Sequence, residues 1–169
     1  RGTYTSHAHN KRMNRKMELL YREAEYFTVL RALLGNDLSL AEQEKLTAGW
    51  KHILTNQFHD IIPGSSIFEV YEDSKKDYEW IATQGEEVEA GFIADAVTEE
   101  ASVYTVFNSN SFVRKGGSVL LLGAAGNSAY LEDGTALKSQ ETEGGLLVEI
   151  PEVPAMGTAT VVLKKAPAA

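Results

Sequence analysis

Apolar side chains recur every three or four residues over most of the first 100 positions, a spacing that predicts amphipathic helices. The first pattern runs from about Asn10 to Leu34, and Gly35-Asn36 follows with residues that tolerate the left-handed conformation at a helix end. Its apolar stripe consists of Met13, Met17, Leu20, Ala24, Phe27, Leu30 and Leu34. We therefore predict one long amphipathic helix over this range.

A second helix is predicted to start at Leu40 or Ala41, because Ser39 and Glu42 have the spacing of a capping box. Its apolar stripe is predicted to comprise Leu46, Trp50, Ile53 and Leu54. The pattern stops before Pro63-Gly64, which breaks any helix.

A third helix is predicted to follow Ser66, which forms another capping box with Glu69, and to run to about Thr98. Gly85 and Gly91 each cost such a helix about 1 kcal/mol relative to Ala. A kink or an early end of the helix at either glycine is therefore an open alternative. Its apolar positions are Ile67, Val70, Tyr71, Tyr78, Ile81, Val88 and Phe92. Three long helices with short connections predict an antiparallel three-helix bundle.

Beyond Glu99-Glu100 the pattern changes to short β-type runs separated by turn residues such as Asp133-Gly134 and Gly144-Gly145. About five strands are predicted, at residues 103–107, 118–122, 137–142, 146–150 and 158–163. The expected fold class is α+β. A three-helix bundle would occupy about residues 1–100, and a partial antiparallel β-sheet or sandwich region about residues 101–169.

Composition narrows the chemistry that this chain can carry. The 169 residues have a formal net charge of -8, which disfavours a nucleic-acid partner, because phosphate binding relies on clustered Lys and Arg. The chain contains no cysteine, which excludes disulfides and thiolate metal clusters. No apolar run approaches the roughly 20 residues that a membrane-spanning helix needs. The chain begins with Arg1-Gly2 rather than Met, so we expect the natural N-terminus to lie upstream.

The stretch Asn56-Gln57-Phe58-His59-Asp60-Ile61-Ile62-Pro63-Gly64-Ser65-Ser66 places an imidazole and a carboxylate side by side between two helical patterns. His59 and Asp60 should lie at a helix C-terminus or just past it. On spacing alone, a helix-end His followed by a turn Asp is the simpler interpretation. A single His beside a single Asp is no complete metal site, because catalytic zinc normally has at least three protein ligands.

Other candidate residues are better explained by structure than by function. His7-Ala8-His9 has the spacing of a metal clamp but lies at the start of a helix, and His52 is predicted to be a boundary residue on a helix surface. Tyr71 and Tyr78 lie on the apolar stripe of the third helix, so we predict core packing rather than a sugar-stacking platform with Trp80. The run Glu86-Glu87-Val88-Glu89 is predicted to form a solvated helix face.

Several segments, in the same order along the chain, resemble the α-mannosidases of glycoside hydrolase family 38. They are Arg1-Gly2-Thr3-Tyr4-Thr5-Ser6, Lys11, Asn14-Arg15, Glu18, residues 56–66, Val106-Phe107-Asn108-Ser109 and Ser139-Gln140. The stretch at residues 56–66 is the most specific of these. The resemblance covers the middle helical domain of that family and the beginning of its C-terminal β region.

The resemblance implies a concrete role for two residues. In this family a divalent metal, usually zinc, is held by residues of an N-terminal barrel and by one His of the helical domain, which by position is His59. Asp60 would contact the substrate by accepting hydrogen bonds from sugar hydroxyls. The implied reaction is retaining hydrolysis of terminal α-mannosides. This chain has no His-x-Asp pair, so the nucleophile and the general acid are expected upstream, and the chain alone is expected to be inactive and to bind zinc weakly.

The resemblance also implies partners. The chain's own N-terminal barrel would be one, with Arg1, Tyr4 and Lys11 helping the bundle to dock onto it, and an α-mannoside carbohydrate would be the substrate. A cytoplasmic location is expected, and the intact enzyme could be a homo-oligomer. Two alternatives stay open: a free-standing structural or protein-binding helical module with His59 as a helix cap, and a family member that acts on another α-mannoside such as mannosyl-glycerate.

Overall fold

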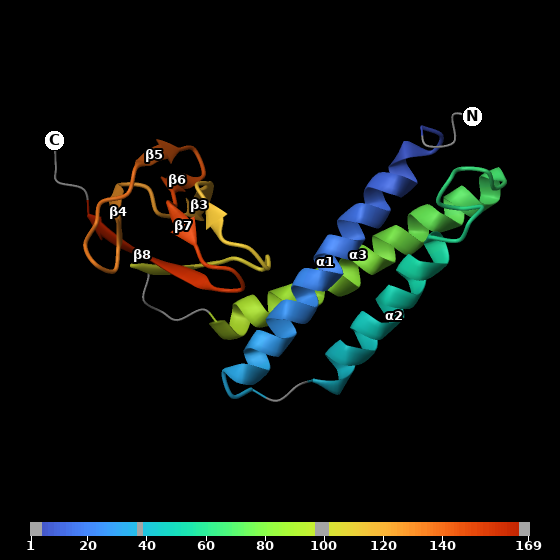
Figure 1. Cartoon of the computed structure of the whole chain (residues 1–169), viewed down its shortest axis with the longest axis horizontal. Coiled ribbons are helices and arrows are strands. Elements are labelled where there is room, and N and C mark those ends of the chain that lie inside the picture. The colour runs from blue at the N-terminus through green and yellow to red at the C-terminus, as the bar shows by residue number, and fades with distance from the viewer. Residues whose placement is uncertain (1–4, 37–38, 97–101, 166–169) are drawn as a thin grey trace. The chain divides into compact units, whose positions relative to one another are not determined.

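A computed structural model describes residues 5–36, 39–96 and 102–165, with the side chains of residues 94–96 left out. The chain divides into two compact units, residues 1–97 and 98–169 (Figure 1). The first unit is helical and the second consists of antiparallel strands, which confirms the α+β fold class. Arg1, Tyr4 and the predicted boundary at Glu99-Glu100 lie outside the described residues.

The helical unit contains α1 (Ala8–Leu33), α2 (Leu40–Asn56) and α3 (Phe68–Ala96). The predicted capping box at the start of α2 is present, because the Ser39 side chain accepts a hydrogen bond from the Glu42 backbone N–H at 3.3 Å. The three helices lie alongside one another, and the connection between α2 and α3 lies at the same end as the start of α1 (Figure 1).

The third helix continues without interruption over its 29 residues, so neither glycine breaks it. Gly85 has a packing role instead, since a Cβ there would lie 2.8 Å from Leu20 Cδ2 and 3.0 Å from Tyr21 Cε2. The close approach of α1 thus offsets the low helix propensity of glycine at this position.

Buried side chains from all three helices form the core of the bundle. Its fully buried members include Met17, Tyr21, Ala24, Ile53, Tyr78 and Ile81. Tyr21 fits against α2 because position 49 is glycine, and its hydroxyl donates a hydrogen bond to the Ile81 carbonyl of α3 at 2.9 Å. One tyrosine therefore contacts both other helices.

Three positions that were predicted to belong to apolar stripes are exposed, and those predictions were wrong. Leu34 is 68% exposed, Leu54 60% and Ile67 67%. Leu34 and Ile67 lie just outside the ends of α1 and α3, where no neighbouring helix covers them. Leu54 follows the fully buried Ile53, and adjacent helical residues point about 100° apart, so both cannot face the core.

A buried polar layer joins the three helices near the α2–α3 connection. Asn10 of α1 donates to the Ser74 hydroxyl of α3 at 2.8 Å, and Ser74 donates to the Asn56 side-chain oxygen at the end of α2 at 2.5 Å. All three side chains are at least 98% buried. A buried polar group costs little only when it is hydrogen-bonded, so this layer fixes how the three helix ends align.

The β unit contains more strands than the five that were predicted. They are β1 (Val103–Phe107), β2 (Arg114–Lys115), β3 (Ser118–Leu122), β4 (Asn127–Leu131), β5 (Ser139–Thr142), β6 (Gly145–Glu149), β7 (Glu152–Val153) and β8 (Thr158–Lys165). The predicted strands correspond to β1, β3, β5, β6 and β8. The additional β4 lacks the β-branched residues that mark a strand in sequence, and β2 and β7 have two residues each.

These strands form the antiparallel sheets β1-β8-β4 and β3-β6-β5 and the small pair β2-β7. Gly144 lies in the tight turn between β5 and β6, as predicted. Leu121 and Val148 of one three-stranded sheet share a buried cluster with Ala129 and Val161 of the other. The two sheets therefore enclose one apolar core.

Candidate functional site

The predicted site lies in the connection between α2 and α3, residues 57–67, which we call the 57–67 loop. Helix α2 ends at Asn56, and the Gln57 backbone N–H still bonds to the Ile53 carbonyl at 3.2 Å. Short-range turns follow, and Gly64 adopts a φ of 93°, which disfavours any other residue there. His59 and Asp60 thus lie just past a helix end, as predicted.

His59 and Asp60 face each other across a loose contact. His59 Nε2 lies 3.4 Å from Asp60 Oδ2, and the two side chains are 77% and 54% exposed. The Phe58 ring lies beside the His59 ring, with centroids 4.2 Å apart. An imidazole and a carboxylate therefore project into solvent together, each with most of its hydrogen-bonding capacity unused.

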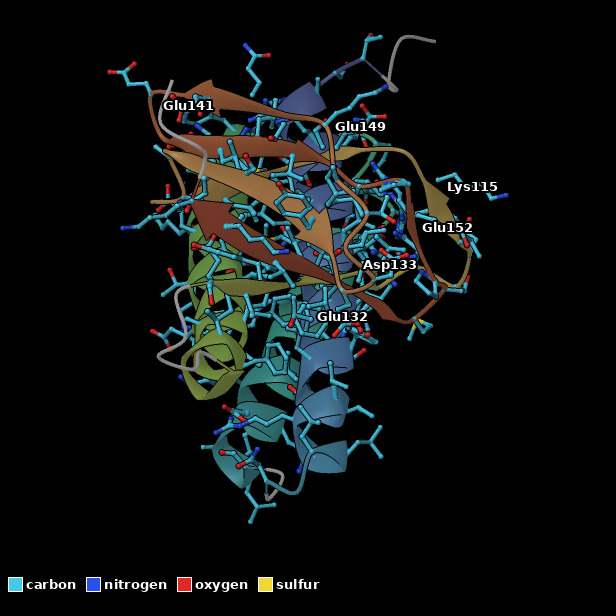
Figure 2. The ribbon with its side chains drawn as sticks, turned by 90° about the vertical axis from the view of Figure 1, so that its left-hand side faces the viewer. Lys115, Glu132, Asp133, Glu141, Glu149 and Glu152 are labelled. Carbon is cyan, nitrogen blue, oxygen red and sulfur yellow. The ribbon has the colours of Figure 1, made fainter. Side chains whose placement is uncertain are left out.

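The residues that the structure describes do not form a complete metal site among themselves. Over residues 5–36, 39–96 and 102–165 no group of three or more His, Cys, Asp or Glu side chains could hold a metal ion. In the β unit, Glu141 lies apart from the neighbouring Glu132 and Asp133 (Figure 2). The exposed His59 imidazole could supply at most one of the three or more protein ligands that a catalytic zinc site needs.

Contacts with α1 hold the first residue of the loop. The Gln57 amide donates to the Glu18 carboxylate at 2.9 Å, and Asn14 donates to the same oxygen at 2.9 Å. The Asn56 amide before the loop also reaches Asp77 of α3 at 3.1 Å. Sequence reasoning did not single out Glu18 or Asp77 as supports of the loop, because residues 39 and 21 positions away leave no local signal.

The other sequence candidates occupy structural positions. The His7 ring stacks on the Tyr71 ring with centroids 3.7 Å apart, and His52 lies on the surface of α2 with its Nδ1 3.3 Å from an Asp77 oxygen. Tyr71 and Tyr78 are 2% and 1% exposed, which confirms the prediction that they pack in the core.

One prediction about the acidic run of α3 was wrong. Glu89 is half-buried rather than solvated, and its Oε1 has no hydrogen-bond partner among the described residues. Burial, together with the nearby carboxylates of Glu23 and Glu86, raises the pKa of Glu89 to about 7. The bundle buries this face because α1 packs along it.

Comparison with protein families identifies the helical unit. A family model described as the alpha mannosidase middle domain matches residues 1–95, which include the whole 57–67 loop. The chain belongs to the α-mannosidase middle-domain family. The resemblance to glycoside hydrolase family 38 is thereby confirmed.

Named relatives of this α-mannosidase middle domain agree with the family. The chain is 39% identical to mouse alpha-mannosidase 2C1 over 84 residues, which are 50% of this chain and 8% of the mouse protein. It is 35% identical to an alpha-mannosidase of Saccharomyces cerevisiae over 71 residues, 42% of this chain and 7% of the yeast protein. The chain therefore aligns with less than a tenth of the length of these relatives.

Solved structures extend the likeness in fold to the β unit. A glycosyl hydrolase family 38 protein from Enterococcus faecalis superposes with a TM-score of 0.64 at 14% identity, and the match covers 99% of this chain and 26% of that protein. An alpha-mannosidase from Enterococcus faecalis V583 gives a TM-score of 0.60 at 14% identity, over 98% of this chain and 22% of the other.

Within the described residues, none of the helices is long and apolar enough to cross a membrane.

Proposed function

We propose that this middle domain contributes one metal ligand, His59, and one sugar contact, Asp60, to the active site of a retaining α-mannosidase. The observation that carries the proposal is the exposure of these two adjacent groups, 77% and 54%, within the segment that the family model matches. Even a fully charged exposed pair contributes only about 0–1 kcal/mol to folding. Folding stability therefore does not explain why these two groups lie exposed side by side, whereas binding of a ligand would explain it.

The proposed chemistry divides the work between this chain and residues outside it. In retaining hydrolysis a carboxylate attacks the anomeric carbon while a carboxylic acid protonates the leaving oxygen, and we assign neither role to this chain. His59 would bind the metal through an imidazole lone pair, and the Asp60 carboxylate would accept hydrogen bonds from sugar hydroxyls and so orient the ring. The metal, when bound, polarises the hydroxyl oxygens that it contacts.

We propose zinc as the metal and a terminal α-mannoside as the substrate. Zinc is borderline-soft and accepts imidazole and carboxylate ligands, and this chain has no thiolate to offer. The mouse and yeast relatives carry the name alpha-mannosidase, which supports the choice of sugar.

The first test compares this chain alone with the full-length protein that carries it, by zinc content and by hydrolysis of p-nitrophenyl α-mannoside. We expect zinc binding and turnover only in the longer protein, because the described residues hold no group of three side chains that could bind a metal. Tight zinc binding by this chain alone, or a full-length protein inert towards mannosides, would contradict the proposal. The second result would favour the binding-module alternative.

The second test separates the two residues in the full-length protein. His59→Ala should reduce bound zinc and lower kcat/KM by more than about 100-fold, since a direct ligand matters at least as much as its outer-shell supports. Asp60→Asn should retain zinc but lower kcat/KM by about 10- to 100-fold, the range for a hydrogen bond to a charged group.

Matched controls come from the same unit. His52→Ala removes an exposed imidazole from the surface of α2, and Asp73→Asn neutralises a 75% exposed carboxylate of α3. Neither lies in the 57–67 loop, so both should leave zinc content and kcat/KM within about twofold of wild type. Unchanged zinc and activity in His59→Ala would refute the ligand assignment, and unchanged kinetics in Asp60→Asn would refute the sugar contact.

A further inference from the structure

The 57–67 loop contains no helix or strand, yet its proposed role requires His59 and Asp60 to be held in place. Both side chains are exposed, so they cannot fix the loop by packing. Their positions must therefore be set by contacts that the rest of the loop makes with the helices. A displacement of about 1 Å in a catalytic group can reduce a rate by 100-fold, so these contacts matter for function.

One side chain of α3 contacts the backbone of the loop at two places, residues 60–61 and residue 66. The Tyr71 hydroxyl accepts a hydrogen bond from the Ser66 backbone N–H at 3.0 Å. The same oxygen lies within donor distance of two carbonyls, Asp60 O at 3.3 Å and Ile61 O at 3.5 Å. The first of these carbonyls belongs to Asp60, a proposed site residue. One hydroxyl therefore links the backbone of residues 60–61 to that of residue 66.

The ring of Tyr71 is itself held in position. The residue is 2% exposed, and the His7 ring stacks on it with an interplanar angle of 8°. Close by, Ser6 packs so tightly against Gly64 that a Cβ on the glycine would lie 2.9 Å from the Ser6 Cβ. The Lys11 ammonium also bonds to the Ser6 carbonyl at 2.6 Å. The loop is therefore enclosed between Tyr71 and the start of α1.

We propose that Tyr71 is a positioning residue for the active site, acting through its hydroxyl on the backbone at Asp60 and Ser66. This inference rests on the proposed function of His59 and Asp60 and adds the group that presents them. Two other tyrosines provide a control for the chemical change, because both are buried in the same bundle and neither hydroxyl makes a hydrogen bond to the loop among the described residues. Tyr21 donates to the Ile81 carbonyl, whereas the Tyr78 hydroxyl has no partner among the described residues.

The test is a series of Tyr→Phe variants of the full-length protein at positions 71, 21 and 78. Hydrogen exchange of peptides covering residues 57–67, zinc affinity, kcat and KM are measured for each. Tyr71→Phe should speed exchange of the loop and weaken zinc binding, each by about tenfold, the equivalent of one or two lost hydrogen bonds. It should lower kcat more than it raises KM, because misplaced groups bind sugar but fail to support the transition state.

The other two variants define what a merely structural effect would look like. Tyr21→Phe should reduce thermal stability without a selective change in loop exchange or zinc affinity. Tyr78→Phe should change none of these readouts, since its hydroxyl makes no bond to lose. If Tyr71→Phe matches Tyr21→Phe in all readouts, or leaves loop exchange at the wild-type rate, the positioning role is wrong.

The design separates this inference from the proposed function. If His59→Ala loses zinc while Tyr71→Phe leaves both loop exchange and zinc affinity unchanged, the proposed function stands and the positioning role fails. If His59→Ala retains zinc, the proposed function fails, and loop exchange in Tyr71→Phe still tests whether the hydroxyl orders the loop. Should Tyr71→Phe not fold, His7→Asn removes the ring stack while keeping a residue type that tolerates the left-handed φ of 47° found there. It should shift exchange and zinc affinity in the same direction by a smaller factor, and wild-type values in His7→Asn would then overturn the proposal.

Discussion

Replacing Gly49 by alanine tests the packing of the bundle, because the only change is one methyl group in the interior of α2. The new Cβ would overlap Tyr21 Oη, Cε1 and Cζ, well inside the 3.0 Å that real Cβ contacts respect. Tyr21 is fully buried, so its ring can move only by disturbing the core or by giving up the bond to the Ile81 carbonyl.

The expected cost follows from three contributions. Overpacking costs about 1–3 kcal/mol, and loss of the tyrosine hydrogen bond costs about 1 kcal/mol. The better helix propensity of alanine returns about 1 kcal/mol. We therefore expect Gly49→Ala to lower the free energy of unfolding of the bundle by about 2 kcal/mol.

Gly91→Ala is the matched control, since it makes the same change inside α3. The nearest atom to its Cβ is Glu42 Oε1 at 3.2 Å, which pairs with Arg31 Nη1 at 2.7 Å and needs to move by only a few tenths of an ångström. Helix propensity should therefore dominate and give a gain of about 0.5 kcal/mol. The two alanine substitutions should change stability in opposite directions.

Urea unfolding followed by tryptophan fluorescence measures this difference. Both tryptophans lie in the bundle, and the Trp50 ring packs edge-on against Tyr21 with centroids 5.7 Å apart, so the signal reports on the affected region. A Gly49→Ala variant as stable as Gly91→Ala, with an unchanged urea m-value, would show that Tyr21 has room to move and would refute the packing described above.

Two further predictions concern other buried polar groups. The raised pKa of Glu89, about 7 against an ordinary 4.5, means that the folded state holds a proton which the unfolded state has released between these pH values. Stability of the bundle should therefore fall by about 1–2 kcal/mol as pH rises through this window, allowing for solvent screening of a partly exposed group. Glu89→Gln should remove this dependence in urea titrations at pH 5 and 8, and an unchanged slope would contradict it. In the β unit, Asn108 donates to the carbonyls of Phe112, Val153 and Pro154 at 2.9, 3.2 and 2.9 Å, so Asn108→Ala should destabilise this corner by about 2 kcal/mol. Faster hydrogen exchange around residues 108–112 and 153–157 would support this, and wild-type exchange would refute it.

Local chemistry was sufficient to predict several features of this chain. Helical periodicity, the Ser39 capping pattern and the break at Pro63-Gly64 depend only on residues within a few positions of one another. The strands at 103–107 and 118–122 were likewise predicted with the bounds that the structure has, because runs of β-branched and apolar residues between turns are a local signal. The same is true of the place of His59 and Asp60 just past a helix end.

Contacts between distant residues decided the rest. Asn10, Asn56 and Ser74 are polar, so hydropathy alone would not place them in a core, yet they are buried because each finds its partner on another helix. Glu89 reads as solvated but lies half-buried where α1 packs beside α3. A hydropathy pattern gives each residue a face of its own helix, whereas burial depends on which neighbour covers that face. For the same reason the sequence pattern marked Tyr71 as core, and only the folded bundle brings its hydroxyl to the backbone of Asp60.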